Sequence, residues 1–440
     1  MKQLIKNVHI LTMDQEWTEY QNGYLLIEEN RISQLGAITD SLPQADQVID
    51  GKQGILLPGM INTHTHTGMI PFRSLGDDVP DRLRRFLFPL EQVMTPALVR
   101  ASAEYAIAEM LLSGVTAFCD MYYFEDEVAQ AAESMQVRAL LGETIIDMAT
   151  CDAKNAAEAL AYCESFIQKW HDHEMITPVI APHAPNTNDL KTLKAILALS
   201  QKYNVPITMH VEEMTYEMEE FAKKYQQTPL AFLHELGYFE QDFIMAHCIF
   251  MTDEDMKLVG KYHEKVRIAH CIGANTKSAK GVAPVRGMLE HQLTVGLGTD
   301  GPSSGNTLDL FTQMRMFANF HKTHLADRGA FPAKEIVRLA TAGGAKTLGL
   351  FDQVGSLEVG KKADLALVET QSVNMFPIFD AYSALVYSAN ASNVSDVWVN
   401  GQQLVKEKQL VQKEVQALRT ALYQQMDQFV AEAKRKAAEV

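Results

Sequence analysis

The sequence of 440 residues has few cysteines, no long hydrophobic run and no excess of basic residues. Its five cysteines form no CxxC pair, so the spacing of a zinc ribbon is absent. Their number is odd, so at least one would stay unpaired, which is typical of a protein from a reducing compartment. No stretch approaches the ~18 apolar residues of a membrane span, and the N-terminus lacks the apolar core of a signal peptide. We therefore expect a cytoplasmic protein that is neither exported nor embedded in a membrane.

The charge balance is acidic, with 39 Lys and Arg residues against 55 Asp and Glu residues and a formal net charge of −16. Such a balance repels phosphate backbones and anionic membranes, so neither nucleic-acid polymers nor membranes are expected partners. No P-loop and no Gly-rich dinucleotide fingerprint is present. His210-Val211-Glu212 matches HxE, but the absence of PCxxC excludes the zinc site of cytidine deaminases.

The middle of the chain, residues 58–352, alternates short apolar runs with amphipathic segments, which indicates βα units around a parallel sheet. Eight such units over about 290 residues predict a TIM (β/α)8 barrel. The predicted strands are residues 59–66, 115–122, 137–144, 176–183, 205–210, 243–247, 266–270 and 294–300.

The two chain ends instead show the period-two alternation of antiparallel strands, in residues 4–35, 354–369 and 394–407. Asn400-Gly401 is a strong hairpin-turn signal. We predict that residues 1–57 and 353–412 pair into one small β-sandwich domain. Residues 413–440 contain no Gly or Pro and have a helical apolar rhythm, so they are expected to form a C-terminal helix.

Most of the predicted barrel strands end at or beside a histidine or an acidic residue. His64 and His66 end the first strand, and residues two apart on a strand point to the same face. His210, His247 and Asp300 end the fifth, sixth and eighth strands. Active sites of TIM barrels lie at the carboxyl ends of the strands, so these groups should converge there. Imidazole with carboxylate suits zinc or iron(II), and the lack of cysteine ligands favours a catalytic over a structural site.

Six ordered motifs resemble the amidohydrolase superfamily, and in particular its branch of aminohydrolases and chlorohydrolases that includes methylthioadenosine and S-adenosylhomocysteine deaminases. They lie at residues 58–80, 181–187, 209–213, 246–255, 269–285 and 295–315. The resemblance implies a distorted TIM barrel with a β-sandwich built by both chain ends. It also implies one divalent metal ion, zinc with iron(II) as the alternative, bound by His64, His66, His210 and Asp300. Binuclear relatives carry a carboxylated lysine at the end of strand four, where this chain has Ala181-Pro182-His183.

The same resemblance assigns three catalytic roles. Glu213 would shuttle protons, His247 would hydrogen-bond the metal-bound oxygen, and Asp300 would take the proton of the attacking water. A divalent cation lowers the pKa of its bound water towards ~7, which supplies hydroxide for attack on an electrophilic ring carbon and allows ammonia to leave. The resemblance favours Glu213 over its neighbour Glu212 as the shuttle.

The resemblance also implies three substrate contacts: Glu91 near the ribose hydroxyls, His183 near the base, and Glu143. Glu143 stands at the position where the family members that accept a homocysteine group have an arginine. Because a glutamate repels a carboxylate there, carboxylate-bearing substrates should be disfavoured.

We predict a deaminase of an adenine-type nucleoside, namely adenosine, 5′-deoxyadenosine, methylthioadenosine or S-adenosylhomocysteine. One alternative is a deaminase or chlorohydrolase of a free purine, pterin or triazine. The alternative of another class is a non-catalytic, metal-stabilised binding protein. The sequence is also compatible with a homo-oligomer.

Overall fold

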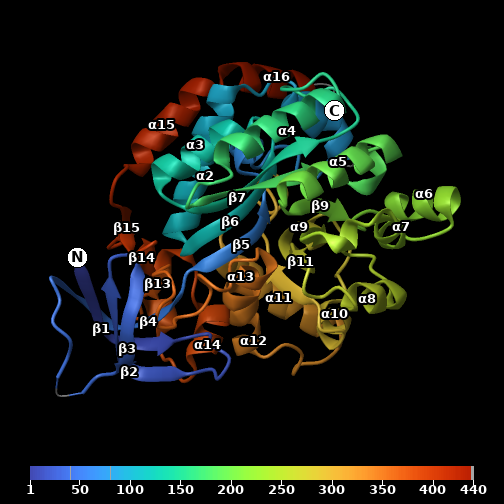
Figure 1. Cartoon of the computed structure of the whole chain (residues 1–440). Coiled ribbons are helices and arrows are strands. Elements are labelled where there is room, and N and C mark those ends of the chain that lie inside the picture. The colour runs from blue at the N-terminus through green and yellow to red at the C-terminus, as the bar shows by residue number, and fades with distance from the viewer. Residues whose placement is uncertain (40, 80, 438–440) are drawn as a thin grey trace. The chain divides into compact units, whose positions relative to one another are not determined.

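The computed structural model describes residues 1–39, 41–79 and 81–437. Within them the strands form two sheets of eight strands each (Figure 1). One is a parallel sheet that curls into a nearly closed barrel, and the other is a mixed sheet to which both chain ends contribute. The predicted fold, a distorted TIM barrel with a β-unit made by both chain ends, is confirmed.

The barrel sheet follows the order of the sequence, with each strand beside the next along the chain. All eight predicted strands are present. Every residue of the second strand is buried, because a parallel sheet covered on both faces uses near-continuous apolar runs. The strands are β5 (Met60–Thr65), β6 (Val115–Tyr122), β7 (Arg138–Ile145), β8 (Ile176–Pro182), β9 (Ile207–Val211), β10 (Phe243–His247), β11 (Val266–His270) and β12 (Thr294–Leu297).

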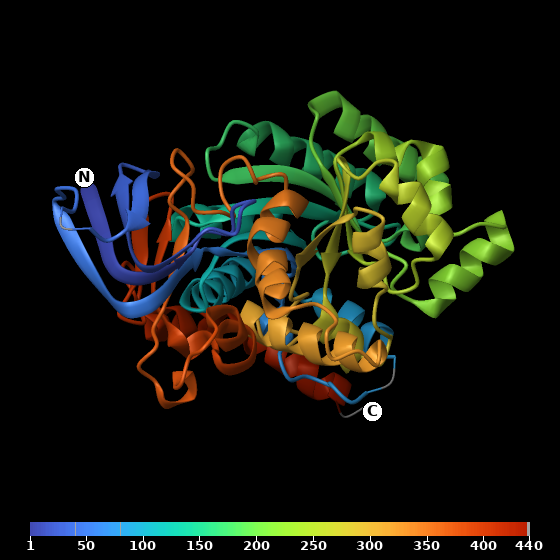
Figure 2. The ribbon, with the colours of Figure 1, turned by 90° about the horizontal axis from the view of Figure 1, so that it is seen from below.

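Helices connect the barrel strands, and Figure 2 shows the green and yellow ones outside the strands. The first long helix begins at Pro96, where the hydroxyl of Thr95 accepts the amide of Leu98 at 3.2 Å. The helices are α1 (Phe88–Glu91), α2 (Pro96–Leu112), α3 (Glu125–Met135), α4 (Ala156–Trp170), α5 (Leu190–Tyr203), α6 (Thr215–Tyr225), α7 (Pro229–Leu236), α8 (Asp253–Gly260), α9 (Ile272–Lys277), α10 (Val285–Glu290), α11 (Leu310–His324), α12 (Ala333–Arg338), α13 (Gly344–Thr347), α14 (Ala381–Ser383), α15 (Val415–Gln425) and α16 (Asp427–Ala437).

The mixed sheet has the strand order β16-β15-β14-β13-β4-β1-β2-β3. Asn400 and Gly401, both at positive φ, join β14 to β15 as the hairpin signal predicts. The predicted strand at 354–369 is shorter than expected and covers only 365–368. The strands are β1 (Lys2–Leu11), β2 (Glu19–Glu28), β3 (Arg31–Ala37), β4 (Gln47–Pro58), β13 (Leu365–Val368), β14 (Val394–Val399), β15 (Gln402–Lys406) and β16 (Gln409–Leu410).

The C-terminal segment forms two helices, α15 and α16, separated at Met426, instead of the single helix that its apolar rhythm predicts. Its last predicted residues, 438–440, lie outside the described residues. The ring of Phe429 packs edge-on against Phe72, with centroids 4.7 Å apart, so the apolar stripe of α16 covers the segment that follows β5.

The described chain forms two compact units. One consists of Met1–Thr63, Ala108–Phe118 and Asp309–Glu414, and the other of His64–Ile107, Cys119–Leu308 and Val415–Val440. The predicted domain boundaries at residues 57, 352 and 412 stay predictions.

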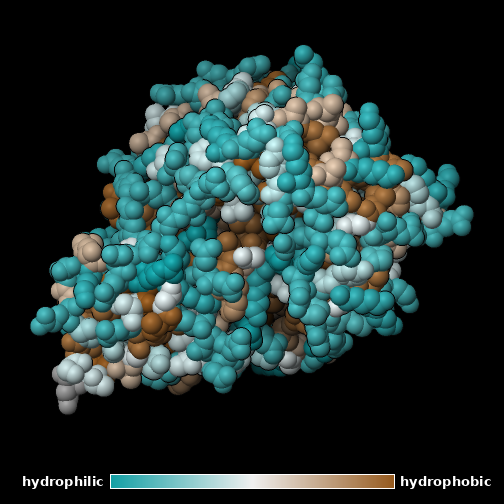
Figure 3. Space-filling model, in the orientation of Figure 1, coloured by the Kyte–Doolittle hydropathy of each residue, from teal (hydrophilic) through white to brown (hydrophobic). Residues whose placement is uncertain are grey.

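The surface seen in Figure 3 is largely hydrophilic, with small hydrophobic patches. Among the described residues, no helix has the length and apolar character needed to cross a membrane.

Candidate active site

A cavity of about 550 Å³ opens at the carboxyl ends of the barrel strands. Its lining includes residues from the ends of seven strands, so the barrel gathers side chains that lie far apart in the sequence. Seven of the predicted site residues line it: His66, Glu91, His183, His210, Glu213, His247 and Asp300. His64 is fully buried beside them.

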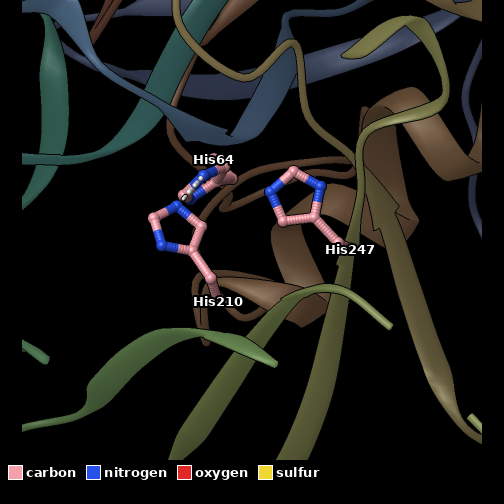
Figure 4. A group of neighbouring side chains, drawn as sticks. All are labelled: His64, His210 and His247. Atoms are coloured by element: carbon pink, nitrogen blue, oxygen red, sulfur yellow. Dashed lines mark hydrogen bonds between the residues drawn. The ribbon is translucent and has the colours of Figure 1, made fainter. Parts of the chain in front are cut away.

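Three histidines from three strands point their rings toward one another (Figure 4). The Nε2 atoms of His64 and His210 are 3.1 Å apart, and His247 offers a further ring nitrogen within 4.8 Å of both. His64 also belongs to a second group with His66 and Asp300, whose ligand atoms lie within the same distance of one another. The predicted metal ligands therefore converge around His64.

Main-chain carbonyls fix the orientation of two of these imidazoles. Nδ1 of His210 lies 2.7 Å from the carbonyl oxygen of His183, and Nδ1 of His66 lies 2.5 Å from that of Met121. A carbonyl only accepts, so Nδ1 carries a proton in both rings, and Nε2 is the nitrogen that a metal ion would use. Metal-binding histidines in proteins are held in this way, with the second ring nitrogen donating to a carbonyl or carboxylate.

Oδ1 of the Asp300 carboxylate lies 3.1 Å from Nε2 of His66, which donates to it. Burial lowers the pKa of His66, but the hydrogen bond and charge of Asp300 raise it to about 9. Burial opposes ionisation of Asp300, but the hydrogen bond and charge of His66 outweigh it and hold the pKa of Asp300 well below its usual range. A main-chain hydrogen bond holds Asp300 next to the end of the first strand, because the amide of Asp300 donates to the carbonyl of His64 at 3.0 Å. Buried imidazole nitrogens and a carboxylate directed at one point form the donor set of zinc or iron(II).

Glu213 and Glu212 turn in opposite directions at the end of β9. Glu213 lines the cavity, with Oε1 3.7 Å from Nε2 of His247 and in direct contact with the ammonium of Lys280. Burial alone would raise the pKa of Glu213, but the charges of His247 and Lys280 hold it well below its usual range. Glu212 is fully buried, and its carboxylate accepts the amide of Leu230 at the start of α7.

Two of the predicted substrate contacts lie in the cavity wall. Glu91, at the end of α1, is 8% exposed, and burial raises its pKa to about 7 although the charge of His66 opposes the rise. His183 follows β8, with Nδ1 3.1 Å from the hydroxyl of Thr187, and burial lowers its pKa to about 4. A neutral imidazole at His183 is therefore available for hydrogen bonds to a heterocyclic ring.

The third predicted contact, Glu143, lies behind the wall of the cavity. Its neighbour Thr144 lines the cavity, and successive residues of a strand point to opposite faces. The Glu143 carboxylate is fully buried and accepts the amide of Glu125 at 3.1 Å, and burial raises its pKa well above the usual range. This placement gives no support to direct contact between Glu143 and a substrate.

Two further residues complete the site. Asn275 lies in the short helix α9 after β11, with Oδ1 2.8 Å from Nδ1 of His247, which directs Nε2 of that ring into the cavity. Lys280, in the loop that follows α9, pairs with Glu213. Both belong to the 269–285 motif, but a single asparagine and a single lysine are too common to be recognised as functional from one sequence.

Strained backbone marks the same edge of the barrel. Glu212, His247, Cys248 and Asp300 are non-glycine residues in the left-handed region, with φ between 47° and 71°. Such conformations are costly for side chains with a Cβ and concentrate at functional sites, where the surrounding structure holds them. The four residues lie at or just after the carboxyl ends of β9, β10 and β12, next to the site residues His210, Glu213, His247 and Asp300.

Comparison with known proteins agrees with this geometry. The model of the amidohydrolase family matches residues 55–404. A 5-methylthioadenosine/S-adenosylhomocysteine deaminase of Thermodesulfovibrio yellowstonii is 34% identical over 427 residues, which cover 94% of this chain and 97% of the relative. A 5′-deoxyadenosine deaminase of Methanosarcina barkeri is 35% identical over 408 residues, or 92% of this chain and 93% of the relative.

A solved structure also matches almost the whole chain. An adenosine deaminase of Xanthomonas campestris, determined with bound zinc, superposes with a TM-score of 0.93 at 29% identity and covers 98% of both chains. With a family match over most of its length and full-length relatives above 30% identity, the chain belongs to the amidohydrolase family, as an enzyme of its deaminase branch.

Proposed function

We propose that the protein is a metal-dependent hydrolytic deaminase of an adenine-type nucleoside: adenosine, 5′-deoxyadenosine, methylthioadenosine or S-adenosylhomocysteine. The observation that carries the proposal is the convergence of histidines, Asp300 and the ionised Glu213 in one cavity of about 550 Å³. That volume lies in the range of small-molecule sites. The names of the relatives in Thermodesulfovibrio, Methanosarcina and Xanthomonas support the substrate class.

We assign one divalent ion, zinc with iron(II) as the alternative, to His64, His66, His210 and Asp300. The fit rests on the carbonyls of Met121 and His183, which engage Nδ1 of His66 and His210 and so leave Nε2 of each ring as the atom for a metal, and on the Asp300 carboxylate 3.1 Å from Nε2 of His66. Bound there, such an ion would lower the pKa of a water molecule and provide a strong nucleophile near neutral pH. The zinc bound by the Xanthomonas relative supports this choice.

The chain's own acids and bases move the protons. Glu213 is ionised at neutral pH and can accept a proton and deliver it to a ring nitrogen of the base, which prepares the amino group to leave as ammonia. His247, oriented by Asn275, directs Nε2 toward Glu213 and donates to developing negative charge once protonated. Asp300 is the second proton acceptor, since its carboxylate stays ionised.

Glu91 and His183 are assigned to substrate binding. Both lie in the cavity wall, one from α1 and one from the end of β8, and so can reach different parts of a bound nucleoside. A carboxyl group suits paired hydroxyls of a sugar, and the neutral imidazole of His183 suits the nitrogens of a purine ring.

The test is ammonia release from the four nucleosides by zinc-loaded protein, with adenine, guanine, a pterin and a triazine as free-ring controls. At least one nucleoside should be turned over with a kcat/KM well above that of every free ring. Glu219→Gln serves as the matched control for Glu213→Gln, because Glu219 is an exposed acid of α6. Turnover of a free ring alone would replace the nucleoside with the heterocycle as substrate.

A further inference from the structure

We propose that Glu217 is a positioning residue, whose buried carboxylate holds the backbone of Glu212 and Glu213 and thereby fixes the Glu213 side chain in the cavity. The inference rests on the proposed function, in which Glu213 carries protons. It adds a residue of the cavity wall that acts through Glu213 and not on the substrate itself.

Glu217 makes hydrogen bonds to two consecutive backbone amides, an arrangement that we call the clamp. It lies in the first turn of α6 and is 2% exposed. One carboxylate oxygen accepts the amide of Glu212 at 2.9 Å, and the other accepts the amide of Glu213 at 3.0 Å. Each oxygen thus holds one of two consecutive peptide groups, which fixes the orientation of the backbone between them.

The backbone that the clamp holds, at Glu212, is in an unfavourable conformation. Glu212 adopts a left-handed conformation, with φ of 52°, immediately after β9 ends at Val211. This conformation is unfavourable for a residue with a Cβ and persists only where the surrounding structure holds it. It also sends the two neighbouring acids in opposite directions, Glu212 to the amide of Leu230 and Glu213 into the cavity. Without the clamp, we expect the turn to relax and the Glu213 carboxylate to leave its place beside His247.

Ion pairing does not explain the burial of Glu217. Among the residues that the structure describes, its donors are backbone amides, and no Lys or Arg forms a salt bridge with it. A carboxylate buried without a cation is unfavourable unless its hydrogen bonds compensate for the lost hydration. Here the two amides that place the proton-carrying acid offset part of this cost, and burial still raises the pKa of Glu217 to about 7.

The experiment compares Glu217→Gln with Glu220→Gln, an exposed acid on the same helix, in the zinc-loaded full chain. Glutamine keeps one acceptor oxygen but turns an N–H toward the second amide. We expect kcat to fall about tenfold to a hundredfold, the scale of one charge-assisted hydrogen bond, with KM changed by less than about threefold. Zinc content should stay at the wild-type value, and Glu220→Gln should behave as wild type.

A double-mutant cycle separates positioning from other roles. If Glu217 acts only through Glu213, then adding Glu217→Gln to Glu213→Gln should lower kcat by less than about threefold further. A full additional loss in that background, or a rise in KM without loss of kcat, would overturn the proposal in favour of direct substrate contact. An unchanged kcat in the single variant would overturn it as well.

The positioning role of Glu217 can be tested even if the protein does not deaminate the proposed nucleosides. If wild-type protein released no ammonia from any nucleoside, crystal structures of wild type and Glu217→Gln would decide. The carboxylate of Glu213 should move away from His247, from which it is 3.7 Å distant here. An unmoved Glu213 would refute the clamp. Should the glutamine variant not fold, Glu217→Asp, which keeps the charge but is too short for both amides, replaces it with the same expected loss.

Discussion

Replacing Asn275 with leucine tests whether the orientation of His247 matters for catalysis. Oδ1 of Asn275 lies 2.8 Å from Nδ1 of His247, and both side chains are almost completely buried, at 0% and 1% exposure. Leucine has nearly the same shape but cannot accept this hydrogen bond. The variant therefore leaves a buried imidazole N–H without its partner, and it frees the ring to carry its proton on Nε2, which faces Glu213.

The expected size of the effect follows from the burial. An unsatisfied buried donor costs about 1 to 3 kcal/mol of folding free energy. At ~2.1 cal/mol/K of unfolding entropy per residue, that loss should lower the Tm of this chain by only about 1 to 3 °C. The rate should respond more strongly. Losing one hydrogen bond that fixes a reacting group should reduce kcat about tenfold to a hundredfold.

The assay is kcat for ammonia release together with the ¹⁵N shifts of the His247 ring, which report which nitrogen carries the proton. Asn275→Asp keeps an acceptor at the same place and should retain more activity than Asn275→Leu. If Asn275→Leu kept wild-type kcat and an unchanged His247 tautomer, the assigned role of Asn275 would be wrong.

Three further predictions address the acids of the cavity. Glu213→Gln should retain metal but lose at least ~100-fold in kcat, the usual scale for a general acid or base, whereas near-wild-type turnover would exclude Glu213 as the shuttle. Lys280→Met removes the cation that helps to lower the pKa of Glu213, so that pKa should rise and the acid limb of the kcat/KM profile should move to higher pH; an unmoved limb would contradict this. Burial raises the pKa of Glu91 from 4.5 to about 7, so the native state binds a proton that the unfolded chain releases between these values, and stability is lost as pH rises through them. Glu91→Gln should therefore gain up to about 3 kcal/mol of unfolding free energy relative to wild type between pH 4 and pH 8 in denaturant titrations, and an equal difference at both pH values would contradict the assignment.

The fold was predictable because its main signals are periodic. Buried parallel strands such as Val115–Tyr122 appear as continuous apolar runs, and each is followed by a helix with its own rhythm. The place where the proposed site residues gather was predictable for a related reason. Side chains at the ends of barrel strands, as at His210 and His247, lie beside the shared mouth of the barrel. Strand ends thus determine the location of the site without knowledge of the loops.

The remaining parts of the site depend on geometry that spacing does not encode. Glu143 was expected in the cavity, but its neighbour Thr144 occupies that face, and a shift of one residue in a strand exchanges the two sides. Asn275 acts from the short helix α9 and Lys280 from the loop that follows it, and the path of this segment is set by packing and not by a repeating pattern. The break between the C-terminal helices at Met426 could not be predicted either, because no Gly or Pro marks it in the sequence.

The central claim is that one divalent ion, held by His64, His66, His210 and Asp300, serves the deamination of an adenine-type nucleoside. Its most direct test is to strip the protein of metal, return zinc in steps, and measure ammonia release from the four nucleosides at each step. Activity with at least one nucleoside should rise in proportion to zinc and level off at one zinc per chain, while Asp300→Ala stays inactive throughout. Activity that survives stripping, or a fully zinc-loaded protein that releases no ammonia from any of the four, would contradict the account.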